Sequence, residues 1–295
     1  FRDCANITNI VIPDSVTEIG EWAFGYCTAL RDITLPDAIS SLGNHAFLGC
    51  SSLTSISIPG SIDTIQQYTF TFCTNLESVT IGNGITEIGY AAFERTALES
   101  IDIPNGVTVI GGYAFFECES LRSIILPEGV VSIGNSVFKN CSNLQSASLT
   151  SSLNQIGNEA FRNCVSLTTI SIPDGVSTIR PDTFRECSNL ESVIFSEGVS
   201  VISSNSFSGC GSLARAVFPS SLTTIGNSAF ADCENLAGVH FTGGAPSTTG
   251  ADAFRGLPFR TPAYIKQNTL NLLELVENKT VRFSMLADSY GKVCF

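Results

Sequence analysis

A phenylalanine recurs about every 23 residues along most of this 295-residue chain, and this period constrains the fold more than any other feature. The steps between successive phenylalanines are 23 residues, except for one of 22 and a last one of 24. These marker residues are Phe1, Phe24, Phe47, Phe70, Phe93, Phe115, Phe138, Phe161, Phe184, Phe207, Phe230 and Phe254. A fixed period of about 20 to 50 residues is typical of solenoids, in which each repeat forms one coil of a stack.

Each repeat contains the pattern Leu-x-x-Ile-x-Ile, shown clearly by Leu53, Ile56 and Ile58. Alternation with a period of two indicates a strand with one buried face. A proline such as Pro59 then ends the strand, because proline cannot donate a ladder hydrogen bond. A second apolar pair and a glycine follow, so we expect a corner, a short extended or 3₁₀ return, and a second corner. Glycines such as Gly43 are expected to supply positive φ or close backbone approach.

Stacking these coils would place like residues on like residues, because no single coil can bury its own apolar face. At the strand spacing of a parallel sheet, about eleven coils would span about 50 Å. Each inward Leu, Ile or Phe should contribute roughly 1.5–3 kcal/mol by burial. A polar substitution at Ile133 or Phe161 should therefore be far more damaging than any surface change. The single step of 22 residues indicates that the fifth coil has lost a residue near Thr96.

The repeat decays after Phe230, which divides the chain into a solenoid over residues 1–245 and a different segment over residues 246–295. We expect the second segment to cap the last coil, since an open end would expose apolar side chains and strand edges. Residues 268–276 have the pattern of a short amphipathic helix with Asn268 as its cap. Phe1 already holds a marker position, so we expect the natural protein to extend further toward its N-terminus.

The composition excludes several classes of partner. Hydrophobic residues make up 43% and charged residues 14% of the chain, which is typical of an ordered, core-forming protein. The net charge of −12 argues against nucleic acid, whose phosphates require clustered Lys and Arg. It argues equally against docking on anionic lipid. No apolar run reaches about 18 residues, so we expect no direct membrane insertion in this segment.

Ten cysteines lie three residues after a marker phenylalanine, and only Cys294 falls outside this column. The column comprises Cys4, Cys27, Cys50, Cys73, Cys118, Cys141, Cys164, Cys187, Cys210 and Cys233. Spacings of a full coil or more do not fit a zinc site. Disulfides along the column remain an alternative, because Cα atoms about 4.8 Å apart fall within the permitted range. Side chains stacked in register point the same way, so we predict buried, free thiols.

The solvent-facing positions of the strands form a column of hydroxyls with few charges. As candidate binding residues on the concave face we take Asp32, Thr34, Ser55, Ser57, Ser78, Thr80, Ser100, Asp102, Ser123, Ser146, Ser148, Thr169, Ser171, Ser192 and Arg215. Solenoids typically bind through such a surface, which here would offer hydrogen bonds to a protein or glycan. The alternative is that the hydroxyls bond one another in ladders and bind no ligand.

Signatures of catalysis are missing from the sequence. His45 and His240 lie more than eight coils apart, or roughly 40 Å at strand spacing, so they cannot share a metal or a catalytic triad. The chain has no phosphate-binding loop, zinc-protease motif or EF-hand loop. We therefore predict no enzyme activity, no catalytic residue, no metal and no cofactor.

Three sequons for N-glycosylation occur, at Asn6, Asn140 and Asn278. A few are expected by chance in a chain rich in Asn, Ser and Thr, so they support a secreted eukaryotic product only weakly.

The repeat resembles the BspA-like class of leucine-rich repeats over about residues 1–241. Residues 43–59 read Gly-Asn-His-Ala-Phe-Leu-Gly-Cys-Ser-Ser-Leu-Thr-Ser-Ile-Ser-Ile-Pro and match it almost position by position. The resemblance implies a right-handed leucine-rich-repeat solenoid, β-rich α/β, with about eleven coils, a parallel sheet on the concave face and a C-terminal cap. It also implies an extracellular or cell-surface protein, since members with an assigned role are surface proteins implicated in adhesion to host proteins or neighbouring cells.

Two functional hypotheses follow from the sequence. In the first, the chain is a non-enzymatic adhesin that binds a host, matrix or neighbouring-cell protein, or a glycan, through the concave face. In the second, it is a building block whose coils stack by self-assembly into an extracellular coat or filament. A cytoplasmic scaffold would also suit reduced thiols.

Overall fold

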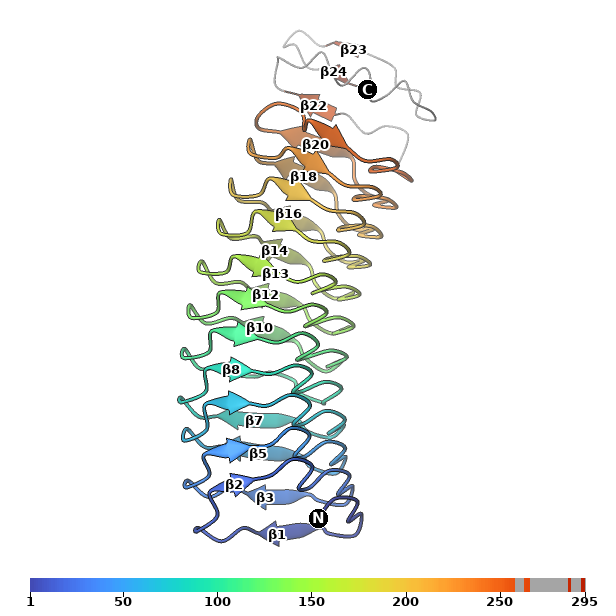
Figure 1. Ribbon diagram of the computed structural model, residues 1–295. Helices are drawn as coiled ribbons and strands as arrows, with labels where there is room; N and C mark the ends of the chain where they lie inside the picture. The colour runs from blue at the N-terminus through green and yellow to red at the C-terminus, as the bar shows by residue number, and fades with distance from the viewer. Residues whose placement is uncertain (258–262, 266–285, 288–292, 295) are drawn as a thin grey trace.

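The computed structural model describes residues 1–257, 263–265, 286–287 and 293–294. It is a parallel-strand β-solenoid of about ten coils of about 23 residues, which run as an elongated stack from the N-terminus (Figure 1). The described residues contain no helix, so the expected β-rich α/β class is narrowed to β alone. In the projection of Figure 1 the later coils lean toward the side that carries the long turns. We therefore name each surface by its strands rather than by curvature.

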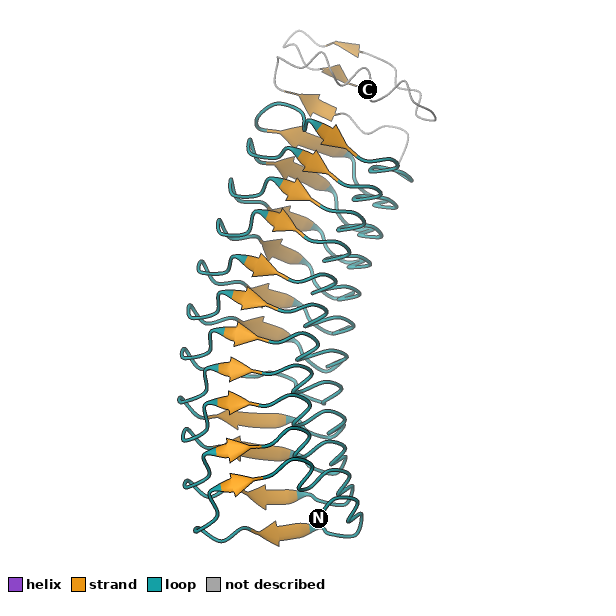
Figure 2. Cartoon of the chain, viewed as in Figure 1, coloured by secondary structure: helices purple, strands orange, loops and turns teal. Residues whose placement is uncertain are grey.

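The solenoid has two walls of parallel strands, to which successive coils contribute their strands. Within a coil the two walls are joined by a proline corner on one side and a long turn on the other (Figure 2). The long-strand wall comprises β1 (Asn9–Val11), β3 (Asp32–Thr34), β5 (Ser55–Ile58), β7 (Ser78–Ile81), β10 (Ser123–Ile125), β12 (Ser146–Ser148), β14 (Thr169–Ser171), β16 (Ser192–Ile194), β18 (Arg215–Phe218), β20 (Gly238–Phe241) and β22 (Ala263–Ile265). Its strands pair coil to coil in the register of the repeat, as Ser55 with Ser78 and Ile56 with Val79.

The return segment that the sequence predicted is extended, and it forms the second, short-strand wall. This wall comprises β2 (Glu18–Ile19), β4 (Ser41–Leu42), β6 (Thr64–Ile65), β8 (Glu87–Ile88), β9 (Val109–Ile110), β11 (Ser132–Ile133), β13 (Gln155–Ile156), β15 (Thr178–Ile179), β17 (Val201–Ile202), β19 (Thr224–Ile225) and β21 (Thr248–Thr249). Its two-residue strands each direct one side chain inward and one outward. The solenoid therefore has two parallel β surfaces.

The third side, which we call the turn edge, is the column of long turns typified by residues 20–30. Its backbone is also bonded from coil to coil, as from Phe24 N to Ala46 O at 2.8 Å and from Phe47 N to Thr69 O at 2.9 Å. Positive φ occurs here two positions before and two after the markers, mostly at non-glycine residues such as His45 and Tyr68, both at 59°. The corner glycines instead permit close approach, because a Cβ on Gly43 would lie 2.4 Å from Glu21 N.

Marker phenylalanines form the centre of the core. Phe161 stacks between Phe138 and Phe184, with ring centroids 5.3 and 5.4 Å away. Its side chain is fully buried, and Ile133 is 1% exposed, so both lie where the sequence predicted the dominant burial energy. The columns of Leu, Ile and Phe form one continuous apolar core through the coils.

The cysteine column lies beside the phenylalanines. The thiol of each buried member donates to the marker carbonyl of the preceding coil, as from Cys164 Sγ to Phe138 O at 3.1 Å. In the fifth coil Thr96 takes the cysteine position and donates to Phe93 O at 3.0 Å. The ten cysteines of the column are free, which confirms the predicted thiols. Burial raises the pKa of Cys50, Cys187 and Cys233 to about 12.

The shortened fifth coil interrupts the long-strand wall. Residues 99–103 form no strand, and the wall is divided between β7 and β10, whereas the short-strand wall continues through β9. The strand ladder of the long-strand wall is also divided between β3 and β5, although both of these coils have a strand. Past residue 245, β21 pairs with β19, Phe254 stacks on Phe230 at 5.5 Å, and β22 pairs with β20. An antiparallel pair, β23 (Leu286–Ala287) and β24 (Val293–Cys294), follows. The predicted helix over residues 268–276 lies outside the described residues.

Candidate functional site

The predicted binding residues all lie on the outer surface of the long-strand wall. All are exposed except Ser123, which is half-buried. Neighbouring coils bring them into register, as Ser57 beside Thr80 and Thr169 beside Ser192. Ser100 and Asp102 belong to the interrupted fifth coil, where no strand orders them. We call this surface the long-strand face.

The hydroxyls of the long-strand face do not form the ladders that the sequence left as an alternative. Among residues 1–257, none of the predicted side chains on this face makes a hydrogen bond or ion pair within the chain. Hydroxyls near the proline corners behave differently. Ser40 donates to Thr17 O and Ser200 to Ser177 O, each at 3.2 Å. The polar atoms of the long-strand face are therefore free for water or a partner.

Large apolar side chains also project from the long-strand face. Val11 is 92% exposed, Ile125 69% and Ile194 64%. Beside Ile125 the interrupted fifth coil leaves an open hollow of about 230 Å³, lined by Ser100, Asp102, Asn105, Ser123, Ile125 and Pro127 among others. The face thus combines free hydroxyls with isolated apolar contacts, a mixture that suits a protein surface.

An aromatic ridge runs along the turn edge through the first half of the solenoid, and the sequence analysis did not identify it. It consists of Trp22, His45, Tyr68, Tyr90, Tyr113 and Phe116. Trp22 and His45 stack at 4.3 Å, and His45 and Tyr68 at 4.8 Å. Tyr90 is 41% exposed and meets both tyrosine neighbours at 5.3 Å. Counting the column two residues before each marker would have revealed most of the ridge.

The local environment shifts two groups on the ridge. Burial lowers the pKa of His45, and the nearby Glu21 carboxylate opposes this shift. The distance from His45 Nδ1 to Glu21 Oε1 is 3.8 Å, which is too long for a hydrogen bond. Burial also raises the pKa of Tyr90. His45 is therefore a neutral member of the stack near pH 7.

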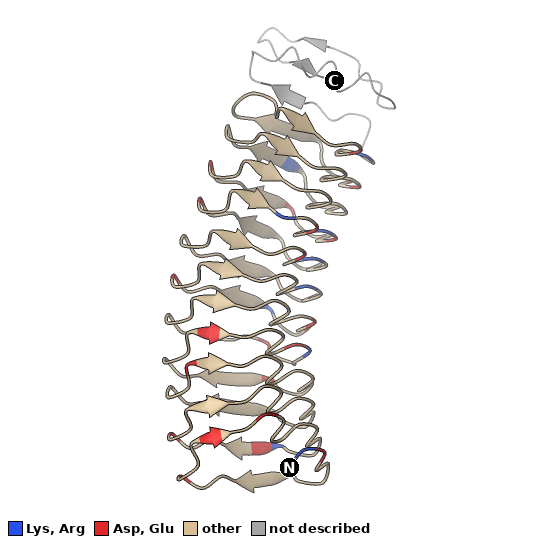
Figure 3. Cartoon of the chain, viewed as in Figure 1, with Lys and Arg blue, Asp and Glu red and all other residues tan. Residues whose placement is uncertain are grey.

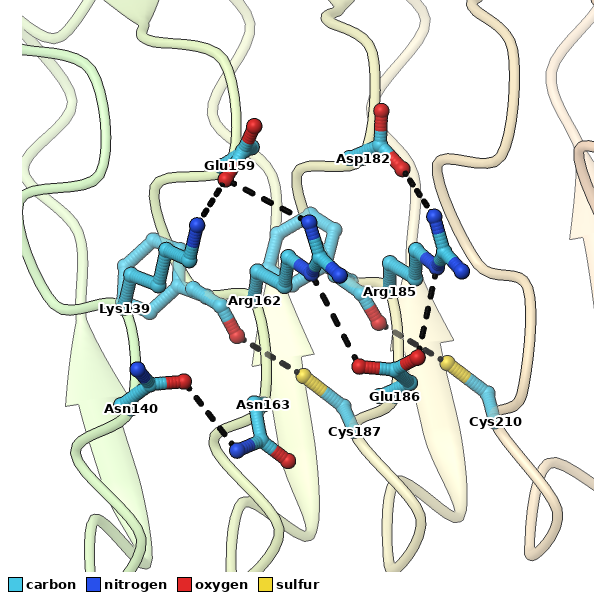
Figure 4. Close-up of polar contacts among 12 residues, drawn as sticks. Lys139, Asn140, Glu159, Arg162, Asn163, Asp182, Arg185, Glu186, Cys187 and Cys210 are labelled. Atoms are coloured by element: carbon cyan, nitrogen blue, oxygen red, sulfur yellow. Dashed lines mark hydrogen bonds and ion pairs between the residues drawn. The ribbon is translucent and has the colours of Figure 1, made fainter.

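Charged side chains replace the aromatics on the turn edge of later coils (Figure 4). Lys139 pairs with Glu159, and Arg162 lies 3.6 Å from Glu159 and 3.7 Å from Glu186. The hydrogen bond from Lys139 lowers the pKa of Glu159. Arg185 continues the ladder to Asp182 at 3.2 Å and to Glu186 at 3.4 Å. These charges neutralise one another, so this part of the turn edge would attract a charged ligand only weakly.

The described residues contain no group of three or more His, Cys, Asp or Glu that could hold a metal ion. Within the same residues no helix is long and apolar enough to cross a bilayer. His45 lies on the turn edge and His240 on β20, and no described contact joins them.

The three sequons differ in their surroundings. Asn6 is exposed. Asn140 is half-buried, donates to Glu117 at 3.3 Å, and accepts from Asn163 at 3.1 Å. Asn278 lies outside the described residues.

The chain is similar to known leucine-rich repeat proteins. A family model for the "BspA type Leucine rich repeat region (6 copies)" matches residues 1–122 and 108–237. Among solved structures, a leucine-rich repeat protein of T. pallidum is 29% identical, with 54% of this chain and 78% of that chain covered and a TM-score of 0.52. A leucine-rich repeat protein of Bacteroides ovatus is 27% identical, with 84% of each chain covered and a TM-score of 0.46. A leucine rich cell surface protein of Faecalibacterium prausnitzii is 29% identical, with 81% and 80% covered and a TM-score of 0.48. No curated protein matches the chain.

Proposed function

The chain belongs to the BspA-type leucine-rich repeat family, and we propose that it is a non-enzymatic protein-interaction module that acts as an adhesin at a cell surface. It would bind a host, matrix or neighbouring-cell protein through the long-strand face. The observation that carries this proposal is the row of exposed polar side chains on that face, none of which has a hydrogen-bond or ion-pair partner within residues 1–257. A rigid wall that orders unpaired hydroxyls at strand spacing offers many hydrogen bonds at little entropic cost.

The thiol column is compatible with an extracellular location. Thiolates, not thiols, are the species that react, and an oxidising compartment favours disulfides between accessible cysteines. Here the cysteines three residues after the markers are buried, apart from half-buried Cys4, and raised pKa values hold them protonated. Free cysteines in this chain therefore do not argue for the cytoplasm.

Adhesion can be tested with beads that carry the protein on a surface coated with basement-membrane protein extract. The Ser148→Arg/Ser171→Arg variant places two bulky charges on neighbouring coils of the long-strand face. We expect bead retention to fall about tenfold or more, which corresponds to a loss of about 1.4 kcal/mol. The change should leave the fold intact because both side chains are exposed.

The matched control is Gln155→Arg/Ser177→Arg, which adds the same charge to exposed positions elsewhere on the same coils. It should be retained like the unmodified protein. Equal retention of the two variants would contradict a role for the long-strand face.

Self-assembly, the second hypothesis from the sequence, predicts instead that light scattering will show particle size growing with protein concentration. An adhesin that does not self-assemble should show the same particle size at every protein concentration.

A further inference from the structure

The aromatic ridge is not required by the fold. Trp22, His45, Tyr68 and Tyr113 occupy the position two residues before the marker, where φ is positive. In later coils Ser136, Glu159, Asp182, Asn205 and Ser228 hold the same position with φ between 52° and 57°. Polar and aromatic residues thus support one backbone conformation. The backbone therefore does not require aromatic side chains at this position. The four aromatic residues there are half-buried, so part of each ring is accessible to a partner, and accessible aromatics are typical of binding surfaces.

The ridge lies on the acidic half of the solenoid. Residues 1–122 contain fourteen acidic and four basic residues, a net charge of −10, whereas residues 123–257 contain ten acidic and six basic residues, a net charge of −4. The acidic strands β2 and β8 of the short-strand wall run into the ridge turns, as Figure 3 shows. Glu21 and Glu94 lie near His45 and Tyr90, respectively. A ligand on the ridge would therefore meet a negative field.

The chain's own arginines show how a cation fits here. The Arg2 guanidinium lies 4.2 Å above the Trp22 ring, and the Arg95 guanidinium lies 5.1 Å above the ring of Phe72, which flanks the ridge. Tyr90 lies in the same coil as Arg95 and is 41% exposed, and within residues 1–257 no cation lies over its ring. Guanidinium groups stack on aromatic rings and pair with carboxylates, and both partners are present along the ridge.

Stacking within the ridge disfavours a glycan. Sugar rings would need open aromatic faces, but Trp22, His45 and Tyr68 are nearly parallel, with interplanar angles of 3° and 10°. Their inner faces cover one another, so mainly ring edges remain for a ligand. Tyr90 is tilted by 63° against Tyr68 and by 43° against Tyr113, which leaves part of its face open.

We propose that the aromatic ridge binds an arginine-rich, cationic segment of a partner protein. Guanidinium groups of the segment would contact the open part of the Tyr90 ring and the carboxylates beside the ridge. The methylene groups of its arginine side chains would lie on the ring edges. This surface is separate from the long-strand face, so the proposal stands even if that face binds nothing.

The probe is a fluorescently labelled nona-arginine peptide, with affinity measured by anisotropy at 150 mM salt on the whole chain. The Tyr68→Ser/Tyr113→Ser variant introduces the residue that Ser136 and Ser228 already hold at the equivalent position. It keeps the net charge unchanged, and we expect it to weaken binding more than tenfold. Nona-lysine should bind several-fold more weakly than nona-arginine, because an ammonium group lacks the planar stacking surface.

Two controls keep this experiment decisive. The Asn205→Ser/Ser136→Ala variant alters the same turn position outside the ridge, and Ser148→Arg/Ser171→Arg alters the long-strand face. Both should bind nona-arginine within about twofold of the unmodified protein, where twofold corresponds to about 0.4 kcal/mol. Equal affinity of the ridge variant and the unmodified protein would overturn the proposal and leave only diffuse attraction to an acidic surface. Chitohexaose binding that the ridge variant abolishes would overturn it in favour of a glycan.

Discussion

Above about pH 9 the protein should lose stability steeply and unfold. Burial raises the pKa of Cys50, Cys187 and Cys233 to about 12 and that of Cys118 to about 11, from an ordinary value of 9.0. Burial likewise raises the pKa of other buried thiols, such as Cys164, above the ordinary value. In the unfolded chain these groups ionise near pH 9, whereas the folded chain resists ionisation.

The sign follows from the number of protons held in each state. A raised pKa means that the native state holds its protons more tightly, so the stabilisation is fully present below pH 9. It is lost as the pH rises from 9 toward 12. Each such thiol should lower the free energy of unfolding by about 1 kcal/mol per pH unit in this interval. Several thiols act together, and a whole domain is stable by only about 5–15 kcal/mol.

Urea unfolding measured between pH 7 and pH 11 checks this expectation. The free energy of unfolding should be level to about pH 9 and then fall, and Cys187→Ala/Cys210→Ala should flatten the fall while lowering stability at pH 7. Thiol alkylation gives a second readout at pH 8, where Cys187 should react about 1,000-fold more slowly in the native than in the unfolded chain. Stability that stays constant to pH 11, or rapid native alkylation, would contradict the buried column.

Phe161→Ala should destabilise the protein by about 3–5 kcal/mol. The ring is fully buried and stacked on both sides, so its removal leaves a cavity that rigid neighbouring coils cannot fill. Chemical denaturation followed by circular dichroism measures the change. A loss below about 1 kcal/mol would show that the marker column is not the centre of the core.

Phe72→Ala is the matched control for this variant. Phe72 also lies in a long turn but is 37% exposed, and its ring meets Arg95 instead of the phenylalanine column. We expect its removal to cost no more than about 1 kcal/mol. A cost equal to that of Phe161→Ala would place the stabilising contacts on the turn edge.

The stacked core could be predicted from the sequence because every coil repeats it. Leu53, Ile56 and Ile58 are buried as the alternation indicated, and Ser55 and Ser57 point outward. The repeat period also fixes which side chains are buried and how the strands pair, because a shift of one residue in the strand register would turn the apolar side chains to solvent. The free thiols followed from the same repetition.

Backbone conformation at the turn edge could not be predicted in this way. The corner glycines were predicted to supply positive φ or close backbone approach. They permit close approach, as at Gly43, whereas positive φ falls on residues such as His45 and Tyr68. The break in the long-strand wall was also missed. The lost residue in the fifth coil indicated an irregularity, but the sequence does not show that residues 99–103 leave the sheet.

The aromatic ridge was missed for a different reason. Apolar periodicity directs attention to inward columns, and the column before the marker changes from aromatic to polar near Ser136. A column that changes from aromatic to polar residues shows no single pattern in the sequence, although its first half forms a continuous aromatic surface.

Deletion of one complete coil tests the stacked architecture most directly. Removing residues 162–184 joins Phe161 to Arg185 and restores the register of every column, with Arg185 taking the place of Arg162. The shortened chain should fold cooperatively, with somewhat lower stability and its remaining buried thiols protected, because coils contact only their neighbours. Removing residues 162–173 instead should abolish folding, since it shifts strands onto turns. If both deletions unfold the protein alike, the coils are not equivalent units and the solenoid account is wrong.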